Sequence, residues 1–276
     1  MPTPAVVAHR GYAGIAPENT IGAAVRAAEY DETAMIEVDV QPAAYGTPVV
    51  VHDERLETER DGRPLTDVDG LVRETSLEAL EEAQVLGTDE SVPTLSALLS
   101  AVSPTVGVNV ELKNPGVADL RPDESLESDE RDRRRELWRP FVERVVEDCR
   151  DFDGEILFSS FCEGAIAALR EVAPEYAAAP LVWGDLAAGL EIARRYDCEA
   201  IHPPRNAIAD TALAATEYAG VPACEPEIDV LALAHEEGRA VNVWTVERWR
   251  SFAELADAGV DGIIAEYPGL GAFSLE

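Results

Sequence analysis

The sequence has 276 residues, and its 54 acidic side chains outnumber the 22 arginine and lysine side chains, giving a formal net charge of −32. Nucleic acid is a poor partner for such a chain, because affinity for nucleic acid rests on Lys and Arg meeting phosphates. No apolar run reaches the length of about 18 residues that a membrane span needs, and the first residues show neither a basic n-region nor an apolar h-region. We therefore expect a cytoplasmic protein without stable membrane anchoring.

The excess of acid suggests a saline environment. Lys113 is the single lysine of the chain. A net charge of this size opposes compaction by self-repulsion, and at molar ionic strength the screening length falls to about 3 Å. The composition favours a halophilic protein; an acidic protein of a dilute cytoplasm is the alternative.

The first elements place polar residues at strand ends. An apolar strand is expected at residues 5–8, with His9 and Arg10 directly after it, and Asn19 or Thr20 can cap the helix that follows. The next strand, residues 35–40, holds two acids at alternate positions, so that both side chains point to the same face.

These two acids, Glu37 and Asp39, are costly on an apolar strand unless something compensates them. A divalent cation is the leading candidate, since hard cations take carboxylate oxygens at about 2.0–2.6 Å. The alternative is a pair of acids at a strand end, one capping a helix and one facing water.

A hairpin is expected next. The connection from Gln41 to Pro48 is too short for a parallel crossover, so the chain should turn near Tyr45-Gly46. This pairing sets Asp39 roughly opposite His52 and brings the histidine to the mouth from which the acids project.

The middle of the chain is polar. Residues 54–105 are mostly irregular, with a helix signal near residue 94, and residues 106–112 form a strand that carries Glu111, with Lys113 just past it. Residues 115–136 are a charged run, interpreted as a solvated loop or exposed helix start without a partner site. A helix should then continue to about Cys149.

Later strands are expected at residues 155–160, 178–183, 199–203, 240–246 and 262–265, with helices between them. Leaving the return arm of the hairpin aside, eight parallel strands alternate with helices, which predicts an α/β fold of the (β/α)8 TIM-barrel type. We expect one domain over residues 1–276, with a small inserted subdomain at about 54–105 after the second-strand hairpin. Polar candidates cluster at strand C-terminal ends, where such barrels place their chemistry: His9, Glu37, Asp39, Glu111, Lys113 and Trp244.

A set of short segments, in order over nearly the whole chain, resembles the glycerophosphodiester phosphodiesterase family: His9-Arg10-Gly11, Pro17-Glu18-Asn19-Thr20, Glu37-x-Asp39-Val40, Val50-Val51-His52-Asp53, Pro93-Thr94-Leu95, Glu111-Leu112-Lys113, Ser159-Ser160-Phe161, Trp244-Thr245-Val246 and Gly259-Val260-Asp261-Gly262-Ile263-Ile264. The resemblance implies a TIM barrel with a small insertion. It also implies cleavage of a glycerophosphodiester to glycerol phosphate and an alcohol, with one Mg²⁺ or Ca²⁺ bound.

The resemblance also implies roles for individual residues. Histidines of the family match His9 and His52, as an acid–base pair. Its metal ligands match Glu37, Asp39 and Glu111, and its phosphate contacts match Arg10 and Lys113.

Two segments depart from the family pattern. The turn usually written Thr-x-Asp-Gly is Ala44-Tyr45-Gly46-Thr47 here, and the last strand ends in Ala265-Glu266-Tyr267-Pro268 instead of Thr-Asp-Tyr-Pro. Neither change touches an expected ligand, so we expect them to affect loop shape and substrate preference rather than the reaction.

The residue types fit phosphodiester cleavage. We expect His9 to deprotonate the glycerol 2-hydroxyl and His52 to protonate the leaving alcohol, giving a cyclic phosphate that water opens with the roles reversed; the opposite assignment stays open. A metal, Arg10 and Lys113 would stabilise the developing charge. Two other functions are open: a related barrel phospholipase resembling a lysophospholipase D, and a barrel that binds phosphodiesters without cleaving them.

Several residues have a structural alternative. Glu111 could pair only with Lys113. Trp244 could line the glycerol pocket or serve packing. His202 lies at a strand end and could reach the rim, whereas His235 is expected on a helix surface. The cysteines Cys149, Cys162, Cys198 and Cys224 show no metal-binding spacing and are expected to be reduced and partly buried.

Salt should raise both stability and catalytic efficiency. Going from about 0.1 M to 1 M ionic strength shortens the screening length from about 10 Å to 3 Å, which weakens self-repulsion and the repulsion of an anionic substrate. We expect the melting temperature and kcat/KM to rise toward molar KCl. A melting temperature that is flat or falling between about 0.1 M and 2 M KCl would remove the argument for adaptation to salt.

Overall fold

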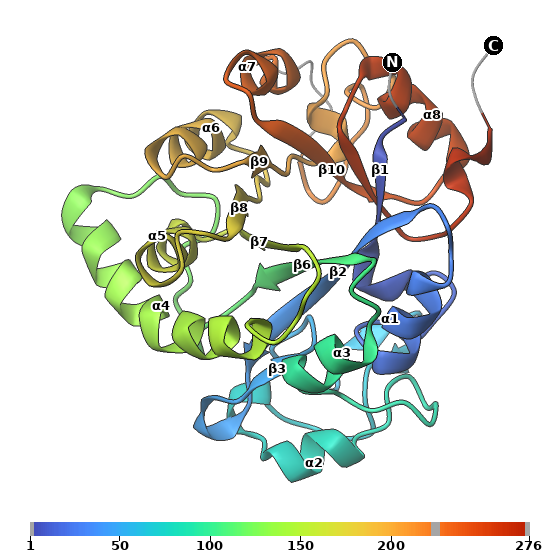
Figure 1. Ribbon diagram of the computed structural model, residues 1–276, viewed down its shortest axis with the longest axis vertical. Helices are drawn as coiled ribbons and strands as arrows, with labels where there is room; N and C mark the ends of the chain where they lie inside the picture. The colour runs from blue at the N-terminus through green and yellow to red at the C-terminus, as the bar shows by residue number, and fades with distance from the viewer. Residues whose placement is uncertain (1–2, 222–226, 274–276) are drawn as a thin grey trace.

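The computed structural model describes residues 3–221 and 227–273. Within them, eight parallel strands lie side by side in chain order around a barrel (Figure 1): β1 (Ala5–Ala8), β2 (Thr33–Pro42), β6 (Gly107–Leu112), β7 (Ile156–Ser160), β8 (Ala177–Pro180), β9 (Ala200–Ile201), β10 (Ala240–Val246) and β11 (Gly262–Ala265). β11 pairs with β1, and β8 meets β9 through a parallel bridge between Leu181 and His202, so the barrel is nearly closed. The predicted (β/α)8 architecture is confirmed.

Helices surround the barrel strands (Figure 1): α1 (Ile21–Ala28), α3 (Leu95–Ala101), α4 (Ser128–Cys149), α5 (Glu163–Val172), α6 (Leu186–Arg195), α7 (Val230–Glu236) and α8 (Trp249–Ala258). Several of these helices begin after a residue whose side chain caps the first turn. The hydroxyl of Thr20 accepts from the Ala23 backbone N–H at 3.1 Å, so Thr20 caps α1 and leaves Asn19 for another role. Asp185 and Asp229 cap α6 and α7 in the same way.

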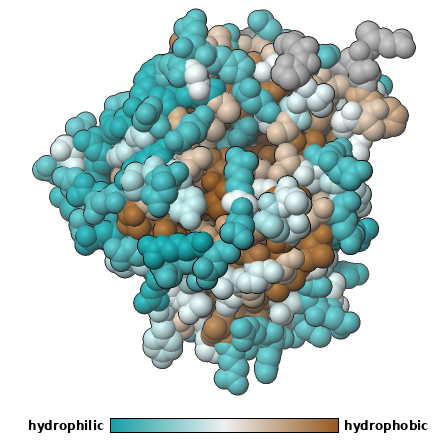
Figure 2. Space-filling model, viewed as in Figure 1, coloured by the Kyte–Doolittle hydropathy of each residue, from teal (hydrophilic) through white to brown (hydrophobic). Residues whose placement is uncertain are grey.

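The core lies between the strands and these helices. The barrel strands are mostly apolar, and β6, β7 and β11 are buried along their whole length, as expected of parallel strands covered by helices. The pair α4 and α5 seals one side, where Trp138 is buried against Gly164, whose missing side chain permits the close approach. Hydrophilic residues dominate the periphery of the face shown in Figure 2, and hydrophobic residues show mainly near its middle.

The predicted hairpin is present, but its register differs by one residue. β3 (Pro48–Val50) pairs antiparallel with β2 through a turn at Ala44–Gly46, and Val40 pairs with Val50. The register therefore sets Asp39 opposite Val51, whose N–H donates to the Asp39 carbonyl at 2.9 Å, instead of opposite His52. Because Pro42 pairs with Pro48, the turn is centred on Tyr45, which has a positive φ of 67°, instead of between Tyr45 and Gly46. His52 follows directly and still reaches the barrel mouth.

The insertion has a small core of its own, made of buried residues between Ala43 and Val92. It holds β4 (Glu59–Arg60), β5 (Arg63–Pro64) and α2 (Leu77–Glu82). The end of the expected range, 54–105, does not belong to this cluster: Leu95, Leu98 and Leu99 of α3 are buried in the main core. α3 is thus the barrel helix between β2 and β6, and the separately packed segment ends near residue 92.

Two late strands are shorter than expected. β8 ends at Pro180 and β9 at Ile201, whereas the sequence suggested residues 178–183 and 199–203. Proline has no backbone N–H for a strand ladder, and Pro203 and Pro204 follow β9 almost at once.

The remaining expectations concern cysteines and the membrane. Cys149, Cys162 and Cys198 are free and buried, and burial raises the pKa of each thiol, to about 12 for Cys149 and Cys162 and about 11 for Cys198. Cys224 lies outside the described residues. Among the helices that the structure describes, none combines the length and apolarity required of a membrane span.

Candidate active site

A cavity of about 450 Å³ opens where the C-terminal ends of the barrel strands meet. Seven of the eight residues selected from the sequence line it: His9, Arg10, Glu37, His52, Glu111, Lys113 and Trp244. The eighth, Asp39, is 1% exposed and does not line the cavity. The sequence-selected set thus comes together at one mouth.

Three carboxylates form the base of this site. Glu37 and Asp39 share a face of β2, and the parallel register with β6 pairs Asp39 with Glu111. All three residues are buried, and one carboxylate oxygen of each lies within 4.8 Å of the others.

The buried charge of Asp39 is balanced by neighbouring cations and a hydrogen bond. Arg10 Nε lies 3.1 Å from its carboxylate and Lys113 Nζ 3.5 Å, and the Asn19 amide donates to it at 2.8 Å. Burial alone would raise the pKa of Asp39, but the charges of His52, Arg10 and Lys113 hold it well below its ordinary value. Asp39 is therefore an ionised carboxylate fixed by the surrounding cations.

Glu37 is not compensated in this way. Its Oε2 accepts from the Arg10 backbone N–H at 3.1 Å, but its buried Oε1 has no hydrogen-bond partner among the described residues. Burial, followed by the charges of Asp39 and Glu111, raises the pKa of Glu37 well above its ordinary value. An orphaned carboxylate oxygen beside two further acids fits a hard divalent cation, which prefers oxygen ligands.

The two basic residues of the site are engaged by carboxylates. Lys113 Nζ lies 2.9 Å from Glu111 Oε1, and Arg10 donates to Glu18 at 2.9 Å as well as meeting Asp39. The charges of these partners raise the pKa of both cations against the opposing effect of burial. Both side chains nevertheless line the cavity, where their charge faces any bound anion.

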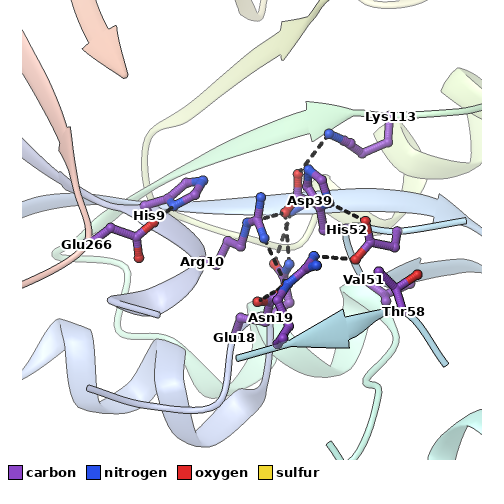
Figure 3. Close-up of polar contacts among 12 residues, drawn as sticks. His9, Arg10, Glu18, Asn19, Asp39, Val51, His52, Thr58, Lys113 and Glu266 are labelled. Carbon is purple, nitrogen blue, oxygen red and sulfur yellow. Dashed lines mark hydrogen bonds and ion pairs between the residues drawn. The ribbon is translucent and has the colours of Figure 1, made fainter. Parts of the chain in front are cut away.

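His9 is held by a residue that the sequence analysis passed over. Its Nδ1 lies 2.6 Å from Glu266 Oε1 (Figure 3). Its Nε2 lies 3.9 Å from Glu37 Oε2. Burial would raise the pKa of Glu266, but the hydrogen bond and charge of His9 lower it. The departure at 265–268 changes no expected ligand, but it supplies the carboxylate that holds His9, so it lies closer to the chemistry than an effect on loop shape and substrate preference implies.

His52 has a similar partner. Its Nδ1 lies 3.0 Å from Asp53 Oδ1, and Asp53 also pairs with Arg60 of β4. Arg60 in turn donates to Glu18 at 3.0 Å, so the insertion is tied to the loop that follows β1. In the view of Figure 3, Arg10 lies between the two histidines. Each histidine thus has Nδ1 on a carboxylate, which leaves Nε2 to exchange a proton with a ligand.

His202 also lines the cavity, as the sequence left open. It is 1% exposed; the Asn242 amide approaches its Nε2 at 2.9 Å, and its Nδ1 has no partner among the described residues. Burial lowers the pKa of His202 to about 3, so this ring is neutral. His235, by contrast, is exposed and pairs with Asp261.

The far end of the cavity is aromatic. Trp244 of β10, Phe161 after β7, Trp183 after β8 and Tyr218 line it together. We call these four residues the aromatic end. Trp244 thus lines the cavity as predicted, although it also packs against its aromatic neighbours.

A wall of this end comes from the charged run, where no site was expected. Leu120 and Pro122 line the cavity. The segment is fixed by Asp123, whose carboxylate accepts from the backbone N–H groups of Trp183, Gly184 and Asp185 at 2.8–3.0 Å. The polar composition of the run concealed the two apolar residues that face inward.

The family model for the glycerophosphoryl diester phosphodiesterase family matches residues 9–270. The chain belongs to this family. A glycerophosphodiester phosphodiesterase of Caldanaerobacter subterraneus is 26% identical over 95% of this chain and 94% of its own length, and one of Bacillus altitudinis is 25% identical with the same coverage. An Oleispira antarctica phosphodiesterase, solved in complex with its product sn-glycerol-3-phosphate, superposes with a TM-score of 0.74 at 24% identity, covering 96% of this chain and 94% of that one.

Membership of the glycerophosphoryl diester phosphodiesterase family identifies the chain as a phosphodiesterase, and the family structures share its barrel. Against that background, the residues that sequence reasoning missed are the partners of the histidines, Glu266 and Asp53, and the apolar wall. Glu266 had a usable signal: it follows β11, the neighbour of β1 in a closed barrel, and so must lie beside His9.

The buried His202 should make stability depend on pH. Its folded pKa of about 3 lies below the ordinary value of 6.5, so the unfolded chain binds the proton first and stability falls as pH drops from about 6.5 toward 3. Relative to wild type, His202→Gln should lose less stability between about pH 6 and pH 4, by up to about 1.4 kcal/mol per pH unit. Urea unfolding in molar KCl measures this, with His235→Gln as the exposed control. Parallel profiles for wild type and His202→Gln would show that His202 does not titrate this way.

Proposed function

We propose that the chain hydrolyses glycerophosphodiesters to glycerol phosphate and an alcohol by histidine acid–base catalysis that depends on one divalent cation, Mg²⁺ or Ca²⁺. The observation that carries this proposal is the pair His9 and His52, each oriented by a carboxylate and both lining the cavity above three buried acids. Glu37, Asp39 and Glu111 would hold the cation. It would supply Lewis-acid stabilisation of the charge on a phosphoryl oxygen.

The histidines carry the proton transfers. With Nδ1–H donated to a carboxylate, the neutral ring presents Nε2 as a base, and the protonated ring presents an acid at the same atom. His9 takes the proton of the glycerol 2-hydroxyl, whose oxygen bonds to phosphorus as the P–O bond to the alcohol breaks. His52 gives its proton to the departing alcohol. Water then opens the cyclic phosphate, with His52 as base and His9 as acid, and both histidines return to their starting states.

Arg10 and Lys113 stabilise the charge that develops on the phosphate. Both are cationic, half-buried near the acids and part of the cavity lining. Fixed cations in a site with little water act more strongly than cations in solution. Glu18, Asp39 and Glu111 hold these side chains in place before a substrate arrives.

We also propose that the enzyme works in a salt-rich cytoplasm. The formal charge of −32 supports this, as does the pairing of exposed arginines with excess acids along α4, for example Arg133 with Glu130 at 2.7 Å. Such exposed pairs add little stability, so screening by salt remains the main relief from self-repulsion.

Removing divalent metal should abolish activity. Dialysis against EDTA should eliminate turnover of glycerophosphodiesters, and Mg²⁺, Mn²⁺ or Ca²⁺ should restore it, because the acids outnumber the cations that contact them. Added metal should also raise the melting temperature, since a ligand that binds the folded state stabilises it.

The variant Glu37→Gln should lose both metal effects, whereas Glu236→Gln, at an exposed residue outside the cavity, should keep them. Full turnover in excess EDTA would contradict a metal requirement.

Replacing either site histidine should slow hydrolysis. His9→Ala and His52→Ala should each lower kcat by about 10²–10⁴-fold, the usual contribution of a general acid or base, while calorimetry still shows metal binding. His235→Ala is the matched control, because His235 is exposed and outside the cavity.

A glycerophosphodiester of 4-nitrophenol separates the two roles, because its leaving group departs without a proton. The first-turnover release of 4-nitrophenolate, measured before water opens the cyclic phosphate, should regain most of its rate in His52→Ala but not in His9→Ala. Rescue of His9→Ala instead would reverse the assignment, and an unchanged rate in either variant would remove that histidine from the mechanism.

A further inference from the structure

We propose that the aromatic end of the cavity binds a quaternary ammonium group, so that the preferred substrate is a glycerophosphodiester of a choline-like alcohol. This inference rests on the proposed function and specifies the leaving alcohol, which the acid–base machinery leaves open. The cationic headgroup would lie against Trp183 and Trp244, with the carboxylate of Glu247 nearby. Each of these residues lines the cavity.

The aromatic rings form a connected group. The ring centroid of Phe161 lies 5.9 Å from that of Trp183 and 5.6 Å from that of Trp244, and the Tyr218 centroid lies 5.7 Å from that of Trp244. The rings are tilted or perpendicular to one another, so they present faces and edges in several directions. Such an arrangement suits a compact cation, which is attracted to ring faces within about 6 Å.

The indoles offer their faces rather than hydrogen bonds. Trp183 Nε1 donates to the Ala219 carbonyl at 2.6 Å, and Trp244 Nε1 donates to the His202 carbonyl at 2.9 Å. Each indole N–H is therefore used within the protein. An alcohol rich in hydroxyl groups finds few partners on these rings, whereas a trimethylammonium group, which donates no N–H bond, needs none.

Charge separates the two ends of the cavity. The cations Arg10 and Lys113 lie at the acidic cluster. Lys113 Nζ lies 5.9 Å from the Phe161 ring centroid but is paired with Glu111 at 2.9 Å. Among the described residues no cation lies over the ring of Trp183 or Trp244, and Glu247, which also lines the cavity, is exposed. Arg205 stacks on Tyr218 at 3.9 Å but is not part of the lining. Because Tyr218 already has this cation on its ring, Trp183 and Trp244 carry the proposed contact.

The spacing of the two ends suits a short diester. Lys113 Nζ lies 5.9 Å from the Phe161 ring centroid, and Phe161 contacts both tryptophans. A phosphate that binds beside Lys113 therefore places the second carbon of the esterified alcohol, and the group attached to that carbon, near the rings of Trp183 and Trp244. Choline carries its quaternary nitrogen at that position.

The test compares two substrates that differ only in charge. Glycerophosphocholine and the glycerophosphodiester of 3,3-dimethylbutanol, its uncharged carbon isostere, are assayed with the metal-loaded enzyme in molar KCl. We expect kcat/KM to favour glycerophosphocholine by roughly 2- to 30-fold, the span of cation–π energies. Trp183→Leu should reduce this ratio toward one, Trp183→Phe should retain part of it, and Glu247→Gln should lower it.

Trp249→Leu and Glu236→Gln are the matched controls. Trp249 stacks on Phe273 outside the cavity and Glu236 is exposed, so neither change should alter the ratio. Equal kcat/KM for the two substrates, or a ratio that Trp183→Leu leaves unchanged, would overturn the inference. A strong preference for the uncharged isostere would instead assign this end to an apolar, lipid-like substituent. Hydrolysis of neither substrate nor of any other glycerophosphodiester would defeat the proposed function, which is a distinguishable result.

Discussion

The structure depends on keeping three carboxylates buried within 4.8 Å of one another at the mouth of the barrel. Burying charge is expensive unless each group is paired and hydrogen-bonded. Asp39 meets this condition through Arg10, Lys113 and Asn19. Glu37 does not, since one of its oxygens is buried without a partner. The site thus holds one more acid than its cations balance, which is the condition expected where a further cation belongs.

The barrel topology supplies the partners that this cluster and its histidines need. Neighbouring parallel strands place Asp39 beside Glu111. Closure of the barrel places β11 against β1, which brings Glu266 to His9 across 257 positions of sequence. The insertion contributes Arg60, which holds Asp53 and Glu18. Each orienting contact therefore comes from a different element, and the rigid strands fix their relative positions.

Much of the site could be predicted because strand ends converge in a barrel. Period-two spacing placed Glu37 and Asp39 on one face, and the strand-end rule brought His9, Glu111 and Lys113 to the same rim. The hairpin was predicted, but its register was wrong by one residue, because the left-handed conformation of Tyr45 is not evident from the sequence.

Features that depend on tertiary packing were missed. The charged run gave no sign that Leu120 and Pro122 would face the cavity, since their orientation is set by the Asp123 carboxylate on three backbone N–H groups of another segment. The leucines of α3, inside the range expected for the insertion, fit either a local cluster or the barrel core by their spacing; they pack in the main core, which only tertiary contacts decide.

The residues at the two ends of the cavity come from separate parts of the sequence. His9, Arg10, Glu37, His52, Glu111 and Lys113 all precede residue 114, whereas the aromatic end lies between Phe161 and Trp244. Changes between Phe161 and Trp244 can therefore reshape the aromatic end without altering these six residues, whereas Glu266, which follows β11 and holds His9, belongs with them. Under the proposed function, such a division gives the fold room to diversify, because residues around the alcohol can change while the groups proposed to act on the phosphate stay the same.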